Sequence, residues 1–595
     1  MLPTLFMLKC SIMNTGNTMK SFHSILMGAL IGLFVSFVNS YSYAVSGYTT
    51  SEISLIYIPL LILLICKLLR LHCKDQDILY ATAIAMGIDI TTTLTSGMYI
   101  TYGFLSHISN KLHLFGFNIS VPPQLFGINR LSFIDIDAMP TYITLALASL
   151  GGLFIAFALR NHFFYKERLR YPIGTVSAIV TQVFKGIFID KKLFAAFFVI
   201  GFVLQMLYFM NQMSLDLTPA LSMFIPGAAL ALTFIPLVFA LFLLLPLGIL
   251  RMLFIGSLLM HLALIPTAIA LFKIPIIPAQ SYDSMLFSVS PILLSYNISF
   301  IVTFLLLYII KYLKRLLVSV KVTMKFTLER LMLFIGVLYL AFLGVAALVF
   351  ISLNGINVAF IAMLILVLFL HFIIIIGNIR TVGETGIGSQ ALYPLITLVM
   401  YVTGTRSALT YAILDPYTGI PMPQTIAASA MNLLRYARFN KGNSIAVVKY
   451  FSIGVIVGSI ITYLYGNILL FIYGIDSPQM PLTRWIPIVI WMSAIYSGKL
   501  TMASLYVSIF SLTFALPVAL LAQVLGFSPF PLLVGITLTP DIGFQALLAY
   551  IIKSLAVKFG AVLHEKLIIG ATFFLLGASC TIILNTVLNA LGLAI

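Results

Sequence analysis

The sequence predicts an all-α fold: a polytopic integral membrane protein with about 16 transmembrane helices. First, 61% of the 595 residues are hydrophobic and only 8% are charged, whereas soluble domains carry roughly 25% charged residues. Second, apolar runs of about 20 residues, the length that crosses a bilayer, recur along the whole chain. Third, basic residues cluster between these runs. We therefore expect one transmembrane domain over 21–593, after a cytoplasmic N-terminus over 1–20.

The apolar runs define the predicted spans in chain order. They fall at 24–43, 52–69, 78–99, 140–159, 192–210, 219–241, 249–272, 291–313, 330–352, 356–378, 386–402, 450–473, 484–498, 502–525, 530–551 and 567–593. The region 219–272 is the least regular, because prolines interrupt it. A faint echo between ATAIAM (81–86) and TIAASAM (425–431) leaves open whether 21–313 and 330–593 are two related halves.

The net charge of +17 reflects 33 basic and 16 acidic residues. Such a balance also occurs in nucleic-acid-binding proteins, but here the basic residues follow the positive-inside rule, in which Lys and Arg stay in the cytoplasm. We therefore expect a multi-pass protein of the cell membrane with the loop 100–139 outside and no nucleic-acid partner. The clusters are Lys67, Arg70 and Lys74; Arg160, Lys166, Arg168 and Arg170; Lys311, Lys314, Arg315, Lys321 and Lys325; Arg435, Arg438, Lys441 and Lys449; Lys553, Lys558 and Lys566.

Two segments do not have the pattern of ordinary spans. YPIGTVSAIVTQVFKG (171–186) opens with Pro and Gly and is short, and PMPQTIAASAMNLLRYARF (421–439) is amphipathic and starts with prolines. Short segments opened by Pro or Gly in both halves of a transporter indicate broken or re-entrant helices around a substrate site. The alternative is a pair of amphipathic helices at the membrane interface. On the first interpretation, both helices begin at their prolines and direct their N-termini at the substrate.

Three acids lie in or beside apolar runs, where an ionisable group is costly and usually functional. Asp89 lies among hydroxyls in GIDITTTLTSG, and Asp541 follows a proline in LTPDIGF. Glu384 lies in a glycine-rich stretch, four residues after Arg380, which would be its partner on a helix. We expect Asp89 and Glu384 to line one central, partly hydrated site. The alternative for each acid is an interfacial residue or a helix cap.

Other chemistries find little support in the sequence. The cysteines, Cys10, Cys66, Cys73 and Cys580, are scattered, which predicts small apolar side chains and no disulfide framework. No metal-site spacing and no GxxxxGK[ST] phosphate loop occurs, so we expect no metal, no cofactor and no enzyme. One alternative is a membrane-embedded glycosyltransferase that uses the D-x-D of Asp135 and Asp137. Another is a channel, which would need rings of pore-lining residues.

Several segments, in order, resemble the oligopeptide transporter family, which includes peptide carriers and the yellow-stripe-like carriers of metal chelates. GALIGLFVSFVNSYSYAVSG (28–47) is similar to its first span, and ILYATAIAMGIDITTTLTSG (78–97) resembles a signature with an acid just after a Gly. YPIGT (171–175) looks like the family's Pro-Ser-Gly-Thr element, GETGI (383–387) resembles a Gly-Glu-Thr element of prokaryotic members, and 527–553 resembles their penultimate span. The chain departs from the family at Val45, Ile173 and Gly388, and its 424–440 segment lacks the expected Asp residues.

The resemblance implies a proton-coupled symporter that imports oligopeptides, with carriage of metal chelates as the alternative, in a prokaryotic cell membrane. Its expected partners are the peptide or chelate, protons and membrane lipid; the oligomeric state is not predicted. We expect Glu384 to couple proton movement and Asp89 to bind the amino terminus of the substrate. The candidate substrate-binding residues are Asn39, Tyr41, Asp89, Thr92, Thr93, Tyr171, Pro172, Gly174, Thr175 and Gln424. The candidate ion-coupling residues are Arg380, Gly383, Glu384 and Asp541.

Overall fold

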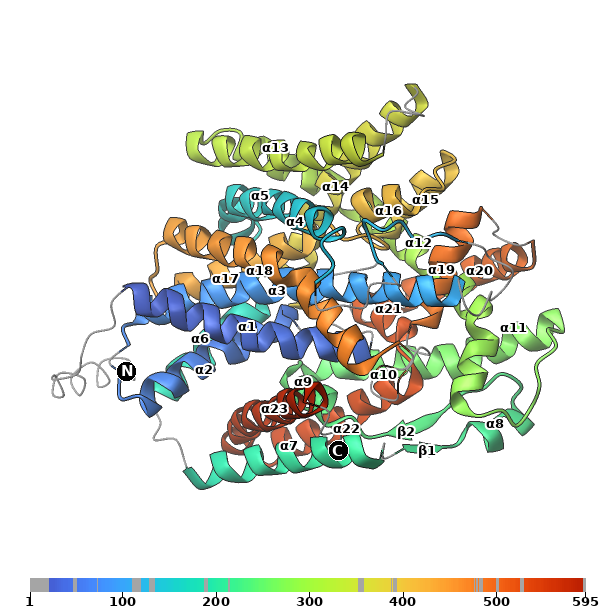
Figure 1. Ribbon diagram of the computed structural model, residues 1–595, viewed down its shortest axis with the longest axis horizontal. Helices are drawn as coiled ribbons and strands as arrows, with labels where there is room; N and C mark the ends of the chain where they lie inside the picture. The colour runs from blue at the N-terminus through green and yellow to red at the C-terminus, as the bar shows by residue number, and fades with distance from the viewer. Residues whose placement is uncertain are drawn as a thin grey trace.

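Helices make up nearly all of the computed structural model (Figure 1). It describes residues 21–46, 51–71, 73–109, 119–127, 134–186, 191–211, 214–351, 358–386, 388, 393–475, 477, 480, 485–498, 502–524 and 529–591. The predicted cytoplasmic segment 1–20, and Cys10 with it, therefore lies outside the described residues.

The first half of the chain contains twelve α-helices and two short strands. They are α1 (Ser21–Ser46), α2 (Ser54–Leu68), α3 (Asp75–His107), α4 (Met139–Ala148), α5 (Leu150–Asn161), α6 (Pro172–Gly186), α7 (Lys191–Asn211), β1 (Ser214–Asp216), α8 (Thr218–Phe224), β2 (Ala231–Thr233), α9 (Pro236–Leu244), α10 (Leu247–Leu258), α11 (Ile265–Phe272) and α12 (Tyr282–Thr323). Segments of π-helix extend α5 at His162–Lys166 and join α10 to α11 at Leu259–Leu264.

The described part of the second half contains eleven α-helices and no named strand. Its helices are α13 (Thr327–Phe350), α14 (Val358–Thr385), α15 (Pro394–Val402), α16 (Ala408–Leu414), α17 (Pro423–Phe439), α18 (Ser444–Tyr473), α19 (Ile486–Ser497), α20 (Met502–Val524), α21 (Pro529–Thr537), α22 (Pro540–Lys558) and α23 (Ala561–Ala590).

Ten described helical segments are long and apolar enough to cross a membrane, which confirms an all-α, multi-pass membrane protein. The count of about 16 spans is not confirmed. α2 has 15 residues and α19 has 12, lengths of about 22 Å and 18 Å at 1.5 Å per residue, against about 30 Å of hydrocarbon. The predicted span 219–241 is divided among α8, β2 and α9, with β1 and β2 paired antiparallel.

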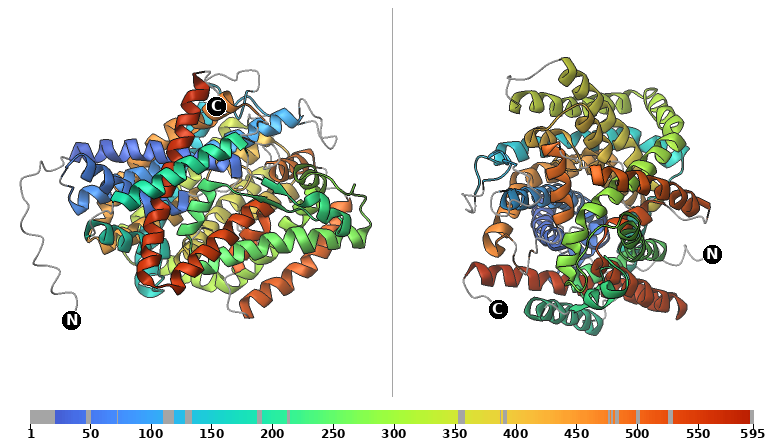
Figure 2. Two further views of the ribbon diagram at one scale, coloured as in Figure 1. Left: turned by 90° about the horizontal axis from the view of Figure 1, so that it is seen from below. Right: turned by 90° about the vertical axis from the view of Figure 1, so that its right-hand side faces the viewer.

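Helix α3 forms the centre of the molecule. It packs between α1 and α18, and the three helices lie side by side in Figure 1. The end-on view in Figure 2 places the blue helices in the middle, with α7 and α23 on one side of them and α13 and α14 on the other. The most apolar part of α3 is 94% buried. Close packing is permitted by glycines, since a Cβ on Gly87 of α3 would lie 2.4 Å from the carbonyl oxygen of Phe451 on α18.

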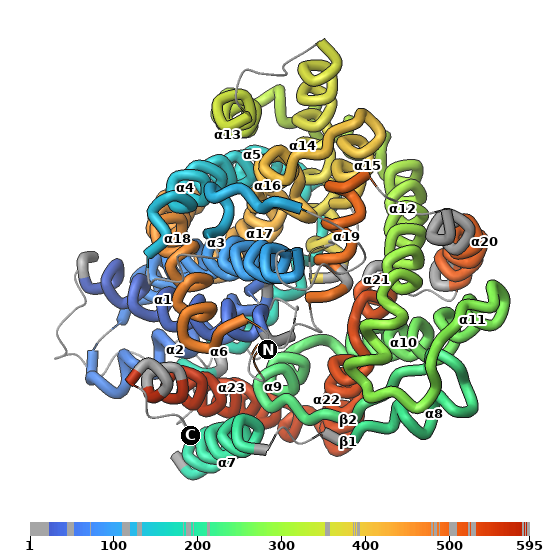
Figure 3. The backbone as a smooth tube through the Cα atoms, turned by 45° about the vertical axis from the view of Figure 1, so that its right-hand side comes forward, coloured from blue at the N-terminus to red at the C-terminus, as the bar shows by residue number. Residues whose placement is uncertain are grey.

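Other helices surround this core. Figure 3 shows α11, α13 and α20 at the periphery. α12 packs against α19 and α20, α10 packs against α21 and α22, and α7 packs against α23. The central position of α3 means that any polar residue in its middle is removed from both lipid and water.

The cysteine prediction is wrong at one pair, because the structure joins Cys66 and Cys73 in a disulfide across the turn between α2 and α3. The free Cys580 is part-buried on α23. The spacing of the cysteines in the sequence did not indicate this disulfide. The pair forms because the turn after α2 folds the chain back and brings the two Cα atoms to 6.4 Å.

Basic loops that are far apart in the sequence meet at one end of the fold. Lys185 at the end of α6 bonds Asp75 at the start of α3, with an N–O distance of 2.6 Å. Arg160 at the end of α5 bonds Glu329 in the first turn of α13, at 3.3 Å. Arg438 of α17 lies 4.4 Å from the centre of a ring on the π-helical segment after α5. We call this region the basic end of the molecule.

Candidate functional site

Asp89 is fully buried in the middle of α3. It accepts hydrogen bonds from one side chain of α1 and from one of its own helix. Its Oδ1 accepts hydrogen bonds from Asn39 Nδ2 at 2.9 Å and from Thr93 Oγ1 at 3.0 Å. Asn39 Nδ2 also donates to the hydroxyl of Tyr57 at 3.0 Å. Helices α1, α2 and α3 thus meet at Asn39, Tyr57, Asp89 and Thr93, which we call the Asp89 cluster.

The Asp89 cluster contains an acid without a basic partner. Both side chains that donate to Asp89 Oδ1 are neutral, and Oδ2 has no hydrogen-bond partner among the described residues. Elsewhere Glu329 bonds Arg160, and Glu384 bonds Arg380. An ionised carboxylate inside a membrane protein is costly unless it is paired. The cluster therefore lacks a positive charge that a proton or a cationic ligand could supply.

A small pocket adjoins this cluster between α1, α2 and α23. Asn39 and Tyr57 contribute polar groups to its wall, opposite Thr572 and Ser579 of α23. Its volume of about 10 Å³ is near the minimum for one water molecule. The cluster is therefore closed in this conformation, and a larger solute needs α23 to move away from α1 and α2.

Two other predicted binding residues of this region are placed differently. Thr92 is buried next to Asp89 but donates to the carbonyl oxygen of Ile88 in its own helix. The ring of Tyr41 faces Phe209 and Tyr473, with centroids at 6.1 and 5.3 Å. The structure thus brings Asn39 and Thr93 to Asp89 and leaves the side chains of Tyr41 and Thr92 out of that network.

The predicted short helices are present, and α6 begins at Pro172 as expected. The residue before it, Tyr171, is buried and has a left-handed backbone with φ of 49°. The backbone N–H groups of Arg170 and Tyr171 donate to the carbonyl oxygen of Gly383 at 3.1 and 3.0 Å. Burial raises the pKa of the Tyr171 hydroxyl well above its usual value, so this group stays neutral. Two backbone hydrogen bonds therefore connect the chain at the start of YPIGT to Gly383, the first residue of GETGI.

The N-terminus of α6 faces α17 rather than an open site. The backbone N–H of Gly174 donates to Asn432 Oδ1 at 3.2 Å, and Asn432 Nδ2 donates to the carbonyl oxygen of Gly386 at 3.4 Å. Only glycine fits at 174, because a Cβ there would lie 2.2 Å from the Asn432 carbonyl oxygen. Thr175 Oγ1 turns back to the carbonyl oxygen of Arg170 at 2.9 Å. The α6 N-terminus is therefore bonded to α17 in this conformation, and its contact with a substrate stays a prediction.

Helix α17 begins at Pro423, also as expected, and its N-terminus is buried. It contacts α5 at Gly152, where a Cβ would lie 1.8 Å from the Pro423 carbonyl oxygen. The carbonyl oxygen of Gln424 accepts from Asn378 Nδ2 of α14 at 3.1 Å. The side-chain amide of Gln424 is fully buried, and neither of its polar atoms has a partner in the described part of the chain. Gln424 is thus a second buried polar group that is open to a ligand.

Glu384 lies in a partly exposed ion-pair network at the basic end of the molecule. Its side chain is 42% exposed and accepts from Arg380, with an N–O distance of 3.2 Å. The Arg380 side chain is 4% exposed, bonds Glu167 as well, and lies 4.3 Å from the ring centroid of Tyr312. Glu384 thus ends α14 in an ion-pair network that shares no residue with the Asp89 cluster, and a single central site lined by both acids stays a prediction. Gly383 contributes its carbonyl oxygen, which accepts from the backbone N–H groups of Arg170 and Tyr171.

Asp541 belongs to a separate buried cluster. It lies in the first turn of α22 and accepts from the hydroxyl of Tyr282 at 2.7 Å. Farther along α22, Lys553 Nζ donates to the carbonyl oxygens of Leu243 and Leu245 at 3.0 and 2.7 Å. These carbonyls flank the break between α9 and α10, where the helical ladder is interrupted. Lys553 therefore satisfies backbone groups that a broken helix leaves free inside a membrane protein.

The D-x-D acids lie in different environments. Asp135 is 2% exposed and accepts from the Tyr99 hydroxyl at 2.9 Å, whereas Asp137 is exposed. Within the described ranges, no three His, Cys, Asp or Glu side chains gather as metal ligands would. The arrangement of Asp135 is that of a buried hydrogen-bond acceptor next to α4.

Sequence reasoning missed several polar residues of these clusters. Three of them are single polar side chains within apolar or amphipathic helices: Tyr57, Asn378 and Asn432. Glu167 lies within a basic cluster. Asp415 had a clearer signal, the turn-forming Asp-Pro after an apolar helix. It accepts from the hydroxyls of Thr397 and Thr418 and so holds the loop that leads into α17.

No family model matches this sequence, and no curated protein matches it significantly. The functional conclusion therefore rests on the residues themselves. The structure brings Asn39, Asp89 and Thr93 together at the centre, and Asn432 in the middle of α17 joins the start of α6 to the end of α14.

Proposed function

We propose that this protein is a secondary active transporter that imports small peptides with protons. The observation that supports it most is the fully buried Asp89, held by neutral donors and without a basic partner in the described structure. A membrane protein retains such an acid where a substrate cation or a proton neutralises it during the functional cycle. The choice of a peptide as substrate, rather than another amine, rests on the resemblance of five segments to oligopeptide transporters.

In this proposal Asp89 binds the ammonium group at the peptide's amino terminus. Asn39 and Thr93 hold Oδ1, so that Oδ2 remains available. The adjoining pocket holds about one water, which makes the described conformation an occluded one without room for a peptide. The Gln424 amide at the start of α17 is the second polar contact, and it suits a peptide group because it can donate and accept.

The ion pairs at the basic end form the gate of this mechanism. Arg380 bonds Glu384 and Glu167. Close to these acids in the chain, the carbonyl oxygen of Gly383 accepts from the backbone N–H groups of Arg170 and Tyr171, which joins GETGI to YPIGT. Glu384 is the more exposed of the two carboxylates, since 42% of its side chain is exposed against 14% for Glu167. Protonation of Glu384 would remove the bond within α14 that helps to orient Arg380 toward Glu167, and so would weaken the connection of α14 to the segment after α5. This gives Glu384 a coupling role at a distance from Asp89.

Helix α6 provides the physical connection between the two sites. At its start it bonds Asn432 of α17, and farther along Ser177 Oγ donates to the carbonyl oxygen of Leu55 on α2 at 2.5 Å. Leu55 lies two residues before Tyr57 of the Asp89 cluster. A shift of α6 would therefore act on the wall of the Asp89 pocket.

The amino-terminal contact can be tested with the purified protein and a pair of matched peptides. A dipeptide with a free amino terminus is compared with its N-acetylated form in a binding measurement by isothermal calorimetry. We expect the free peptide to bind and the acetylated one to bind at least about tenfold more weakly, because it lacks the charged donor. Equal binding of both peptides would contradict the role of Asp89, and binding of neither would contradict a peptide substrate.

A further inference from the structure

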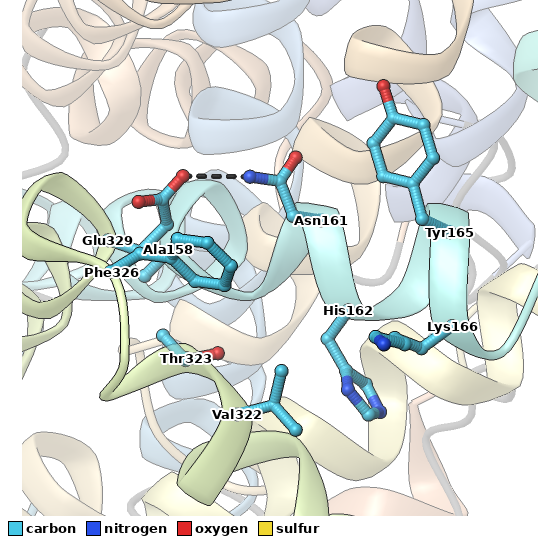
Figure 4. A pocket seen from close by; sticks show the side chains of 9 residues that line it. All are labelled: Ala158, Asn161, His162, Tyr165, Lys166, Val322, Thr323, Phe326 and Glu329. Carbon is cyan, nitrogen blue, oxygen red and sulfur yellow. Dashed lines mark hydrogen bonds between the residues drawn. The ribbon is translucent and has the colours of Figure 1, made fainter.

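The last residues of α12 extend beyond the part of this helix that can lie in hydrocarbon. The helix has 42 residues, a length of about 63 Å at 1.5 Å per residue, against about 30 Å of hydrocarbon. Its uncharged part, 284–310, accounts for about 40 Å of this length. The end of the helix reaches the cavity of Figure 4, which Val322 and Thr323 line at the basic end of the molecule. We call residues 311–325 the α12 arm.

The α12 arm carries five positive charges and no negative one. All five side chains are exposed, and none of them forms an ion pair within the described ranges. They are Lys311, Lys314, Arg315, Lys321 and Lys325. A cluster of about four to eight Lys or Arg on an amphipathic helix, or just cytoplasmic of a membrane helix, is typical of sites for anionic lipid.

Exposed apolar side chains form a stripe along the same arm. Ile310, Leu313, Leu317 and Met324 are 77%, 41%, 62% and 51% exposed. Their spacing of three, four and seven residues puts them on one side of a helix. An apolar stripe that faces water would be costly, so this side of the arm belongs against lipid.

The apolar stripe lies between the face that packs on the protein and the basic residues. At about 100° per residue, Leu317 lies about 100° round the helix from Leu316, which is buried. Lys321 and Lys314 lie about 40° and 60° farther round in the same direction. This order of faces is that of a helix at the membrane interface, with its apolar side toward acyl chains and its lysines among headgroups.

Unpaired cations also crowd around one ring at the start of the arm. The Tyr312 ring centroid lies 5.5 Å from Lys311 Nζ, 5.9 Å from the Arg315 guanidinium and 4.3 Å from the Arg380 guanidinium. Arg380 has two carboxylate partners, whereas Lys311 and Arg315 have no carboxylate partner in the described structure. Like charges at this separation repel each other. An anion beside Lys311 and Arg315 would offset that repulsion.

We propose that the α12 arm binds anionic phospholipid on the cytoplasmic side of the membrane. The lipid phosphates lie at the basic residues, and the acyl chains lie against the apolar stripe. A zwitterionic lipid gains less from the five charges, because its own cation offsets its phosphate. A nucleic acid or an acidic soluble protein would match the charges but would leave the apolar stripe in water. The stripe therefore assigns the partner as lipid, whatever the transported substrate is.

Native mass spectrometry of the detergent-purified protein tests this proposal. The protein is incubated with equal amounts of phosphatidylglycerol and phosphatidylcholine that have identical acyl chains. We expect at least about a tenfold preference for phosphatidylglycerol, because each engaged cation contributes about fivefold. Equal retention of the two lipids would overturn the proposal.

A competition arm separates lipid from soluble phosphate. Glycerophosphoglycerol, the headgroup without acyl chains, is added at the concentration of the lipid. We expect it to displace no phosphatidylglycerol, because it gains nothing from the apolar stripe. Displacement at equal concentration would show that the arm takes a soluble phosphate, and the lipid assignment would be wrong.

Variants locate the binding at the α12 arm. Lys314→Gln together with Lys321→Gln should remove most of the preference, at about fivefold for each charge. The matched control, Lys558→Gln together with Lys566→Gln, removes two exposed cations of another basic cluster and should retain the preference. A preference that survives the arm variant, or that falls equally in the control, would overturn the proposal. If a variant does not fold, lipid competition on the unmodified protein still decides it.

Discussion

The substitution Asp89→Asn separates the charge of Asp89 from its shape. The amide oxygen of Asn can still accept from Asn39 and Thr93, which lie at 2.9 and 3.0 Å from the present carboxylate oxygen. The unfolding free energy should therefore change by less than about 1 kcal/mol. What the variant loses is the charged hydrogen bond to a peptide ammonium, worth about 1.5–3 kcal/mol. We expect the Kd for a dipeptide to rise about 10- to 150-fold.

The assay is binding of a labelled dipeptide to detergent-purified protein, with thermal unfolding of the same samples as a check on folding. Asp135→Asn is the matched control, since Asp135 is also a buried acid, is 2% exposed and accepts from Tyr99. The control should bind the dipeptide with the affinity of the unmodified protein. The reasoning is refuted if Asp89→Asn folds normally and still binds with unchanged affinity, or if Asp135→Asn loses binding equally.

Three further substitutions test the packing and the gate. Gly152→Ala should cost about 1–3 kcal/mol of unfolding free energy, because its Cβ meets the backbone of α17, whereas Gly248→Ala, with nothing within 4 Å, should be neutral or slightly stabilising. Lys553→Met should lower the melting temperature by removing two charged hydrogen bonds, worth about 3–6 kcal/mol together; Lys558→Met, on the exposed side of the same helix, should change it little. Glu384→Gln should cost less than about 1 kcal/mol, because its ion pair is 42% exposed on the acid side. It should nevertheless abolish proton-driven uptake while dipeptide binding persists, and retained uptake would contradict the gate.

The starts of the short helices were predictable because proline acts locally. Pro172 and Pro423 fix the first turn of a helix whatever the rest of the chain does, and α6 and α17 begin there. What α6 contacts was not predictable, since Asn432, which accepts from Gly174, is 258 residues away. Local pattern contains no information about that pairing.

Asp89 and Glu384 show the same limit of reasoning from local sequence patterns. Asp89 could be identified because a carboxylate in the middle of an apolar run is rare and costly. Tyr57, which accepts from Asn39 in the same cluster, could not be identified, because a single Tyr in an apolar helix is common and the contact crosses between helices. Glu384 was assigned to the centre from its flanking glycines, yet these end α14, with Gly386 at φ of 88°, and leave the acid half exposed.

The predicted number of spans is not confirmed, for a related reason. Hydropathy measures how apolar a stretch is but not whether one helix runs through it. The run 219–241 is apolar throughout but contains α8, β2 and the start of α9. Pro236 begins one helix, and Pro246 separates α9 from α10. The sequence therefore predicts the class of the fold better than its count of crossings.

The most direct test of transport is uptake of a labelled dipeptide into proteoliposomes that contain the purified protein. The outside is made acidic relative to the inside, and a protonophore is added to a parallel sample. We predict that the dipeptide accumulates inside above its external concentration and that the protonophore abolishes this accumulation. Uptake that never exceeds equilibrium, that ignores the proton gradient, or that is absent for every dipeptide of a panel would contradict proton-coupled peptide transport.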